Sequence, residues 1–72
     1  MTLKEFVNEV ETASLSRPSH IREGQFAFNY VNEKYGVARA VQYEDGVDCY
    51  YRDWDIMKFL ECAYKRIVDN GN

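Results

Sequence analysis

The sequence predicts a mainly α-helical domain, a compact bundle of three or four helices spanning residues 1–72. The length suits one domain, because 72 residues leave no room for a second core. Two segments, one near each end of the chain, repeat apolar residues at helical spacing. The composition is that of a folded chain, with 46% hydrophobic residues and a single proline. We expect only residues 70–72 to be frayed.

The first helix is predicted to start after Thr2 and to fade near Ala13. Thr2 and Glu5 have the spacing of a capping box, in which each side chain accepts a hydrogen bond from the other residue's backbone N–H. The apolar residues that follow recur with the period of one helix face. These residues are Leu3, Phe6, Val7 and Val10.

A second helix is predicted over residues 20–35, after a break at residues 14–19 that holds three serines and the proline. Ser19 is the candidate N-cap. Gly24 is unfavourable inside a helix by about 1 kcal/mol relative to Ala, so it indicates close approach of another helix. Gly36 is suited to end the helix. The predicted buried face comprises Ile21, Phe28, Val31 and Tyr35.

Residues 37–51 have two interpretations. Residues 37–41 fit a short third helix with Val37, Ala40 and Val41 turned inward. The same stretch also alternates between apolar and polar residues on both sides of Asp45-Gly46, which is a β-hairpin signal. We favour the helix and keep a hairpin near residues 38–51 as the alternative.

The last helix is predicted to begin at Asp53 as N-cap, with Asp55 in the first turn, where the helix dipole favours acids. Lys65 and Arg66 lie near its end, where the dipole favours cations. The predicted buried face comprises Ile56, Phe59, Leu60, Ala63 and Ile67.

The sequence shows no constellation of residues suited to catalysis or metal binding. The single histidine, His20, has no orienting acid nearby, and no glycine-rich phosphate loop is present. Cys49 and Cys62 have no second Cys or His near either of them. We therefore expect no enzyme activity, no cofactor and no metal. Because the first residues form no apolar signal segment, we expect a cytoplasmic protein with reduced cysteines and no membrane span.

An aromatic run near acidic residues is the most unusual composition in the chain. Tyr50, Tyr51 and Trp54 cannot all enter so small a core. One interpretation packs one or two of them inward as a lid over the second and last helices. The other uses them as exposed anchors for a partner.

Two spaced patterns resemble those of a group of short uncharacterised bacterial and phage proteins. They are Arg-x-Gly-Gln-x-x-Phe-Asn at residues 22–29 and Asp-x-x-Tyr-x-Asp-x-x-Ile-x-x-Phe-Leu at residues 48–60. The similarity extends over about residues 1–67. Cys49 stands where those proteins often have proline, and residues 43–45 replace a Gly-Thr-like turn. The resemblance implies a phage or mobile-element origin and no particular activity.

Arg22, Gln25 and Asn29 share one polar stripe on the second helix. On a structural interpretation this stripe binds the turn at residues 48–53, with Arg22 on a carboxylate and the amides on backbone groups. On a functional interpretation it faces a partner. The candidate partner-binding residues are therefore Arg22, Gln25, Asn29, Asp48, Tyr50 and Trp54.

We predict a non-enzymatic protein-interaction module that binds a host protein or a second copy of itself as a homodimer. A net charge of −3 disfavours phosphate binding. The alternative is nevertheless a small nucleic-acid-associated regulator. It would use Arg17, His20, Arg22 and Arg39.

Overall fold

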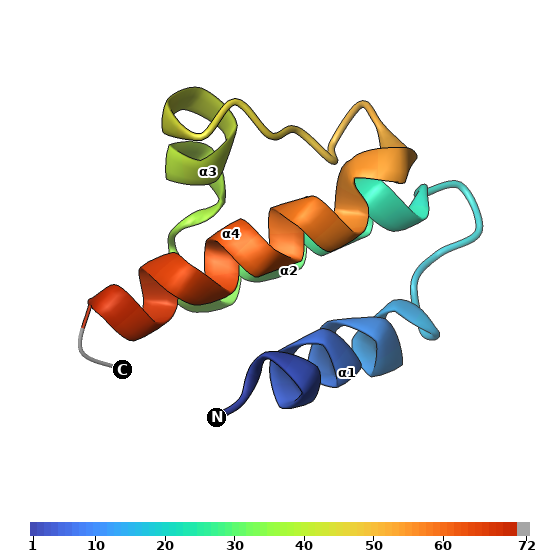
Figure 1. The fold of residues 1–72 in the computed structure, drawn as a ribbon. Coiled ribbons are helices and arrows are strands. Elements are labelled where there is room, and N and C mark those ends of the chain that lie inside the picture. Colours follow the sequence, from blue (N-terminus) through green and yellow to red (C-terminus); the bar gives the residue numbers. More distant parts are fainter. Residues whose placement is uncertain (71–72) are drawn as a thin grey trace.

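The computed structural model describes residues 1–70 and folds them into four α-helices (Figure 1). No strand forms among these residues, so the mainly α prediction is confirmed and the hairpin alternative is wrong. No helix in this part of the chain is long and apolar enough to cross a membrane. The elements are α1 (Leu3–Ser14), α2 (Glu23–Tyr35), α3 (Ala38–Glu44), a 3-10 turn η1 (Asp53–Asp55) and α4 (Ile56–Asp69).

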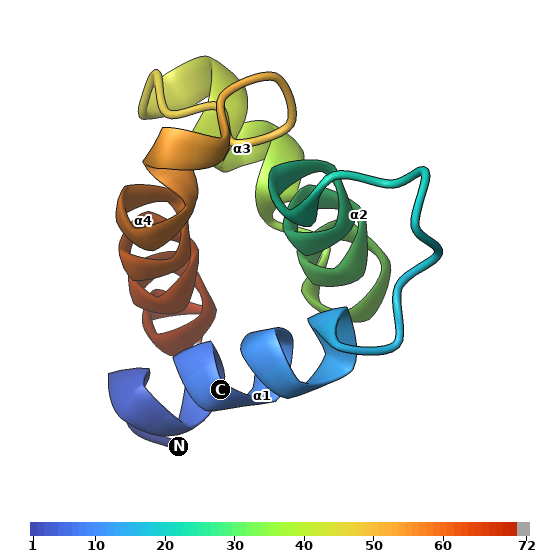
Figure 2. The same cartoon turned by 90° about the vertical axis from the view of Figure 1, so that its right-hand side faces the viewer.

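The helices form three layers with α2 and α4 in the middle (Figures 1 and 2). α1 crosses one side of this pair, while α3 and the chain that follows it cover the other side. α1 and α3 each contact both middle helices. The largest fully buried side chains come from all of these layers: Phe6, Val10, Val31, Val41, Cys49, Phe59, Leu60 and Ile67.

α1 begins with the predicted capping box. The Glu5 N–H donates to Thr2 Oγ1 at 3.1 Å, and the Thr2 N–H donates to Glu5 Oε1 at 2.7 Å. Phe6 and Val10 are buried, so the predicted stripe faces the core. The remaining stripe residues, Leu3 and Val7, are only half-buried.

α2 begins at Glu23, three residues later than the predicted start at His20. The preceding chain instead forms a turn in which the Ile21 N–H donates to the Pro18 carbonyl at 3.0 Å. A helix that started at residue 20 would need helical backbone dihedral angles at residues 20–22, where the chain instead forms this turn. Ser19 therefore does not cap the helix, and the prediction that it would is wrong.

Arg17 holds this turn in place. Its Nε donates to the Ile21 carbonyl at 3.1 Å, and its Nη1 donates to the carbonyl and hydroxyl of Ser14 at 3.0 and 2.9 Å. The guanidinium thus donates hydrogen bonds to a backbone carbonyl at the end of α1 and to one in the loop that follows it. This use of Arg17 fixes where α2 can start.

Gly36 ends α2 in the left-handed conformation, with φ of 72°. Its N–H donates to the carbonyls of Val31 and Asn32, which the end of the helix would otherwise leave unpaired. α3 follows at once. Ala38 and Val41 are buried, whereas the predicted inward residue Ala40 is half-buried.

α4 starts at Ile56, after η1, and Asp55 rather than Asp53 occupies its N-cap position. The assignment of Asp53 as this cap is wrong, because its carboxylate binds α2. The Asn70 N–H donates to the Arg66 carbonyl at 3.1 Å, so Asn70 closes the helix. Of residues 70–72, which are predicted to be frayed, Asn70 makes this hydrogen bond, and residues 71–72 lie outside the described part. Four of the five residues predicted to be buried on α4 are buried, namely Phe59, Leu60, Ala63 and Ile67. The fifth, Ile56, is half-buried.

A carboxylate between α1 and α2 joins the two helices. Glu9 accepts hydrogen bonds from the hydroxyls of Tyr30 and Tyr35 at 2.7 and 2.8 Å. Lys34 Nζ lies 2.6 Å from the same carboxylate. Burial raises the pKa of Glu9, but the hydrogen bonds from Lys34, Tyr30 and Tyr35 outweigh it and hold the pKa below its ordinary value.

Candidate functional site

Residues 48–55, here called the docked loop, lie against the N-terminal end of α2 and lead into α4 (Figure 1). Arg22 binds this loop at two points. Its Nη1 lies 3.2 Å from Asp53 Oδ1, and its Nη2 donates to the Tyr50 carbonyl at 2.6 Å. Arg22 therefore reaches a carboxylate, as the structural interpretation of the polar stripe predicts.

Asp53 also caps α2. The N-cap residue of α2 is Arg22, whose side chain makes no capping hydrogen bond. The Gly24 N–H instead donates to Asp53 Oδ1 at 3.1 Å. A carboxylate at this position satisfies a free N–H of the first turn and lies favourably in the helix dipole. The docked loop thus completes a helix that begins 30 residues earlier in the chain.

Gly24 is the point of closest approach between α2 and the docked loop. A Cβ at this position would overlap the Cys49 carbonyl oxygen and would lie 2.6 Å from Asp53 Oδ1. The Cys49 thiol donates to the Gly24 carbonyl at 3.3 Å. The sequence correctly indicates a close approach at Gly24, but the neighbour is this loop and not another helix.

Tyr50 turns inward from the docked loop. Its ring packs edge-on against Phe28, with centroids 5.5 Å apart, and its hydroxyl accepts a hydrogen bond from Gln25 Nε2 at 3.2 Å. The Tyr50 N–H donates to Asp48 Oδ1 at 2.9 Å, which forms an Asx turn. Three of the predicted partner-binding residues, Gln25, Asp48 and Tyr50, therefore have intramolecular roles in holding the loop.

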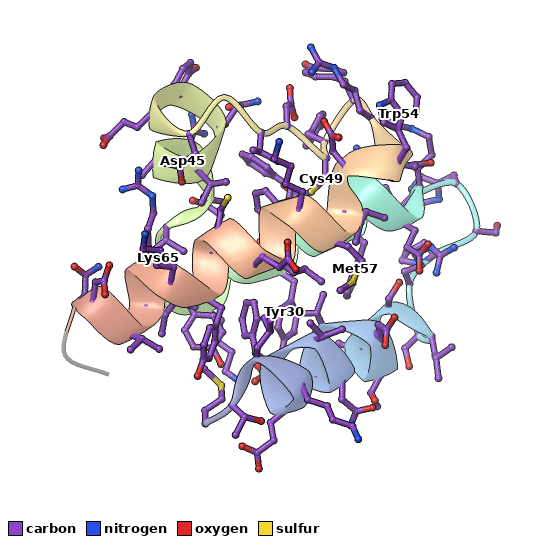
Figure 3. All side chains as sticks on the ribbon, viewed as in Figure 1. Tyr30, Asp45, Cys49, Trp54, Met57 and Lys65 are labelled. Atoms are coloured by element: carbon purple, nitrogen blue, oxygen red, sulfur yellow. The ribbon has the colours of Figure 1, made fainter. Side chains whose placement is uncertain are left out.

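Two aromatic side chains of the docked loop remain in solvent. Trp54 is 80% exposed and Tyr51 is 70% exposed. Figure 3 shows Trp54 pointing away from the helices at the edge of the molecule. We call these two side chains the aromatic surface. The loop beneath them is anchored, so the rings are presented by a fixed backbone.

Asn29 does not join this arrangement. It is exposed, and its side chain makes no hydrogen bond within residues 1–70. The structural interpretation of the stripe is thus right for Arg22 and wrong for Asn29. For Gln25 the partner is a side-chain hydroxyl and not turn backbone.

The residues of the nucleic-acid alternative do not form one basic patch. Arg17 is bonded within the α1–α2 loop, and Arg22 is paired with Asp53. His20 is exposed in that same loop. Arg39 lies on α3, beyond the opposite end of α2, a helix about 20 Å long.

The site offers little covalent or metal chemistry. Cys49 is fully buried, and burial together with the nearby Asp48 carboxylate raises the pKa of its thiol to about 12, so it is not a thiolate at neutral pH. Cys62 is half-buried, and both cysteines are free. In the described chain, no three His, Cys, Asp or Glu residues are grouped so that they could hold a metal ion.

Tyr51 belongs to the aromatic run that the sequence offers as exposed anchors, but it is absent from the predicted partner-binding residues. Its ring packs edge-on against that of Tyr50, with centroids 4.8 Å apart, and is otherwise exposed. Gly24 indicates a close approach, but nothing in the sequence identifies Cys49 as the neighbour, because that contact depends on how two distant segments meet.

No protein-family model, curated protein sequence or solved structure matches this chain significantly.

Proposed function

We propose that this protein is a small protein-interaction module that binds its partner through the aromatic surface. The observation that carries the proposal is the exposure of Trp54 and Tyr51, two large rings three residues apart on one anchored loop. Trp and Tyr are enriched among the residues that dominate binding energy at protein interfaces.

The anchoring of the docked loop supports the proposal. Arg22, Asp53 and Cys49 hold its backbone against α2. A loop that is ordered before binding loses less conformational entropy in the complex, and this favours affinity. The polar residues singled out in the sequence thus act as supports, and the exposed rings make the contact.

We propose in addition that the chain is encoded by a phage or mobile element, as the sequence resemblance implies, and that its partner is a host protein. A phage- or mobile-element-encoded chain of this size would act in the cytoplasm of its host by occupying a surface on a larger protein. The partner would need an apolar pocket for an indole ring, because that ring is the largest exposed apolar group of the loop.

The test is capture from a bacterial host lysate with the tagged chain and three variants. We expect the wild-type chain to retain one protein in stoichiometric amount. Trp54→Ala and Tyr51→Ala should each reduce its retention at least about tenfold, as loss of a dominant interface residue does. Tyr43→Ala is the matched control, because Tyr43 is 76% exposed but lies on α3.

Circular dichroism on each variant would establish that the helices are intact. A partner that all three variants retain equally well would contradict the proposal. Retention of no protein by the wild-type chain would contradict it as well.

A further inference from the structure

A second uncovered surface lies between α1 and α4. Leu3 and Val7 of α1 and Met57 of α4 line an open groove of about 650 Å³. Figure 3 shows Met57 between α4 and α1. Leu3 and Val7 are half-buried and Met57 is 51% exposed, so the fold leaves apolar surface here in contact with water.

Three charged residues line the groove: Lys4, Glu5 and Glu11. Glu5 is held in the capping box with Thr2, whereas Lys4 and Glu11 carry opposite charges at a fixed spacing. Lys4 and Glu11 are seven residues apart on α1, which is two helical turns or about 10 Å. At this distance they cannot pair with each other. Neither forms a salt bridge within residues 1–70. Val7 and Asn8 occupy the centre between them.

The α1 surface of one chain is complementary in charge to the α1 surface of a second copy. In an antiparallel pair of α1 helices related by a two-fold axis between positions 7 and 8, Lys4 of each chain lies opposite Glu11 of the other. Both ion pairs form at once, and Val7 of each chain lies at the centre of the interface. We propose that the groove binds a second copy of this chain through antiparallel pairing of the two α1 helices.

The size of the surface indicates a weak and reversible dimer. α1 has 12 residues and is about 18 Å long, so the contact is smaller than the roughly 800 Å² per partner of a stable complex. The dimer should therefore form only at high protein concentration. This proposal does not depend on the aromatic surface, which lies on a different part of the molecule.

The test is sedimentation equilibrium of the purified chain at low salt. We expect the average mass to rise from that of one chain near about 10 μM toward that of two chains near about 1 mM. Val7→Glu should keep the mass at one chain throughout. Tyr43→Ala, on α3, should behave like the wild-type chain.

Exchanging the charges of Lys4 and Glu11 distinguishes this specific pairing from nonspecific association. Lys4→Glu and Glu11→Lys should each raise the dissociation constant at least about tenfold, because each replaces two ion pairs with two repulsive contacts. The double variant should restore dimerisation to within about threefold of wild type. Lys4→Glu places an acid in the first turn of α1, and Glu11→Lys places a base in its last turn. Both charges are favourable in the helix dipole, so α1 should remain folded.

Three results would overturn the proposal. The first is a single-chain mass at every concentration. The second is a double variant that dimerises no better than the single variants. The third is a groove occupied by another protein, seen as capture from lysate that Val7→Glu abolishes while the purified chain stays monomeric.

Discussion

Gly24 lies in α2 and is also in close contact with the docked loop. Its N–H, its carbonyl and its missing side chain all face the docked loop. In an ordinary helix, replacing Gly with Ala would stabilise the protein by about 1 kcal/mol. Here the added Cβ would meet the Cys49 carbonyl, which can move only if the loop moves. We therefore expect Gly24→Ala to destabilise the protein by about 1–3 kcal/mol in urea unfolding.

Asn29→Ala is the control for this prediction. Asn29 is exposed on the same helix and contacts nothing in the docked loop, so its replacement should change the free energy of unfolding by less than about 0.5 kcal/mol or stabilise slightly. A Gly24→Ala protein as stable as the wild type would show that the loop is not tightly docked.

The two cysteines should differ in reactivity. Cys49 is fully buried and its pKa is raised to about 12, whereas Cys62 is half-buried. A thiol reagent at pH 7.5 to 8, near the ordinary cysteine pKa of about 8.5, should modify Cys62 in the native protein and reach Cys49 only after denaturation. Mass spectrometry of the labelled peptides checks this. Equal labelling rates in the native state would contradict it.

At the residue scale, the sequence predicts that Arg22 binds a carboxylate of the turn at residues 48–53, but it does not predict that Asp53 also caps α2. An aspartate just before an apolar run fits a local N-cap, so the sequence predicts that Asp53 caps the last helix. In the structure it caps α2 instead. Nothing in local spacing distinguishes a cap of the following helix from a cap of a distant one.

Among the elements, α1 is attached to α2 by the Glu9 carboxylate as well as by apolar contacts such as that of Phe6 with Tyr35. We expect Glu9→Gln to destabilise the protein by about 1–2 kcal/mol at pH 7, because three hydrogen bonds to a charged group are weakened. The pKa of Glu9 is lowered in the folded state. Its contribution is therefore complete above the unfolded pKa, about 4.3, and is lost as the pH falls through the folded pKa.

Urea unfolding of both proteins between pH 7 and pH 3 checks this dependence. The difference in stability between wild type and Glu9→Gln should be constant above about pH 5 and should shrink below about pH 4.3. Glu33→Gln is the matched control, because Glu33 is exposed on α2 and forms no salt bridge in the described chain. A difference that stays constant down to pH 3 would contradict the role given to the carboxylate.

The elements best predicted from sequence are those with their own periodicity and caps. α1 begins where the capping box of Thr2 and Glu5 places it, and the core side of α4 is the predicted one. α2 starts later than the sequence predicts, because a turn held by Arg17 occupies the residues before it. The structure of residues 45–52 is not predictable from local sequence, because contacts with α2, α3 and α4 hold that segment.

As a whole, the molecule already has the dimensions of a compact monomer. Its accessible surface is 4647 Å², and the scaling law for monomers gives about 4650 Å² for a chain of this mass. Its radius of gyration is 11.1 Å, against about 11.2 Å expected for 72 residues. The fold therefore does not need a second chain to bury its core.

Light scattering at about 10 μM should accordingly give the mass of one chain, 8.5 kDa, in the concentration range where the groove is unoccupied. Trp54→Ala should have the same mass, because the aromatic surface is separate from the groove. A mass of two chains at this concentration would mean that the dimer is far tighter than the groove can explain.

The cap that Asp53 provides to α2 has a consequence for the order in which the protein takes shape during synthesis. Gly24 and Asp53 are 29 positions apart, so a ribosome adding about 5–20 residues per second needs roughly 1.5–6 s to make the second after the first. During that interval the Gly24 N–H of the nascent chain lacks its partner, the Asp53 carboxylate. The first turn of α2 acquires its native cap only after the chain past residue 53 has emerged and folded back. The N-terminal end of α2 is therefore completed after the rest of the helix has been synthesised.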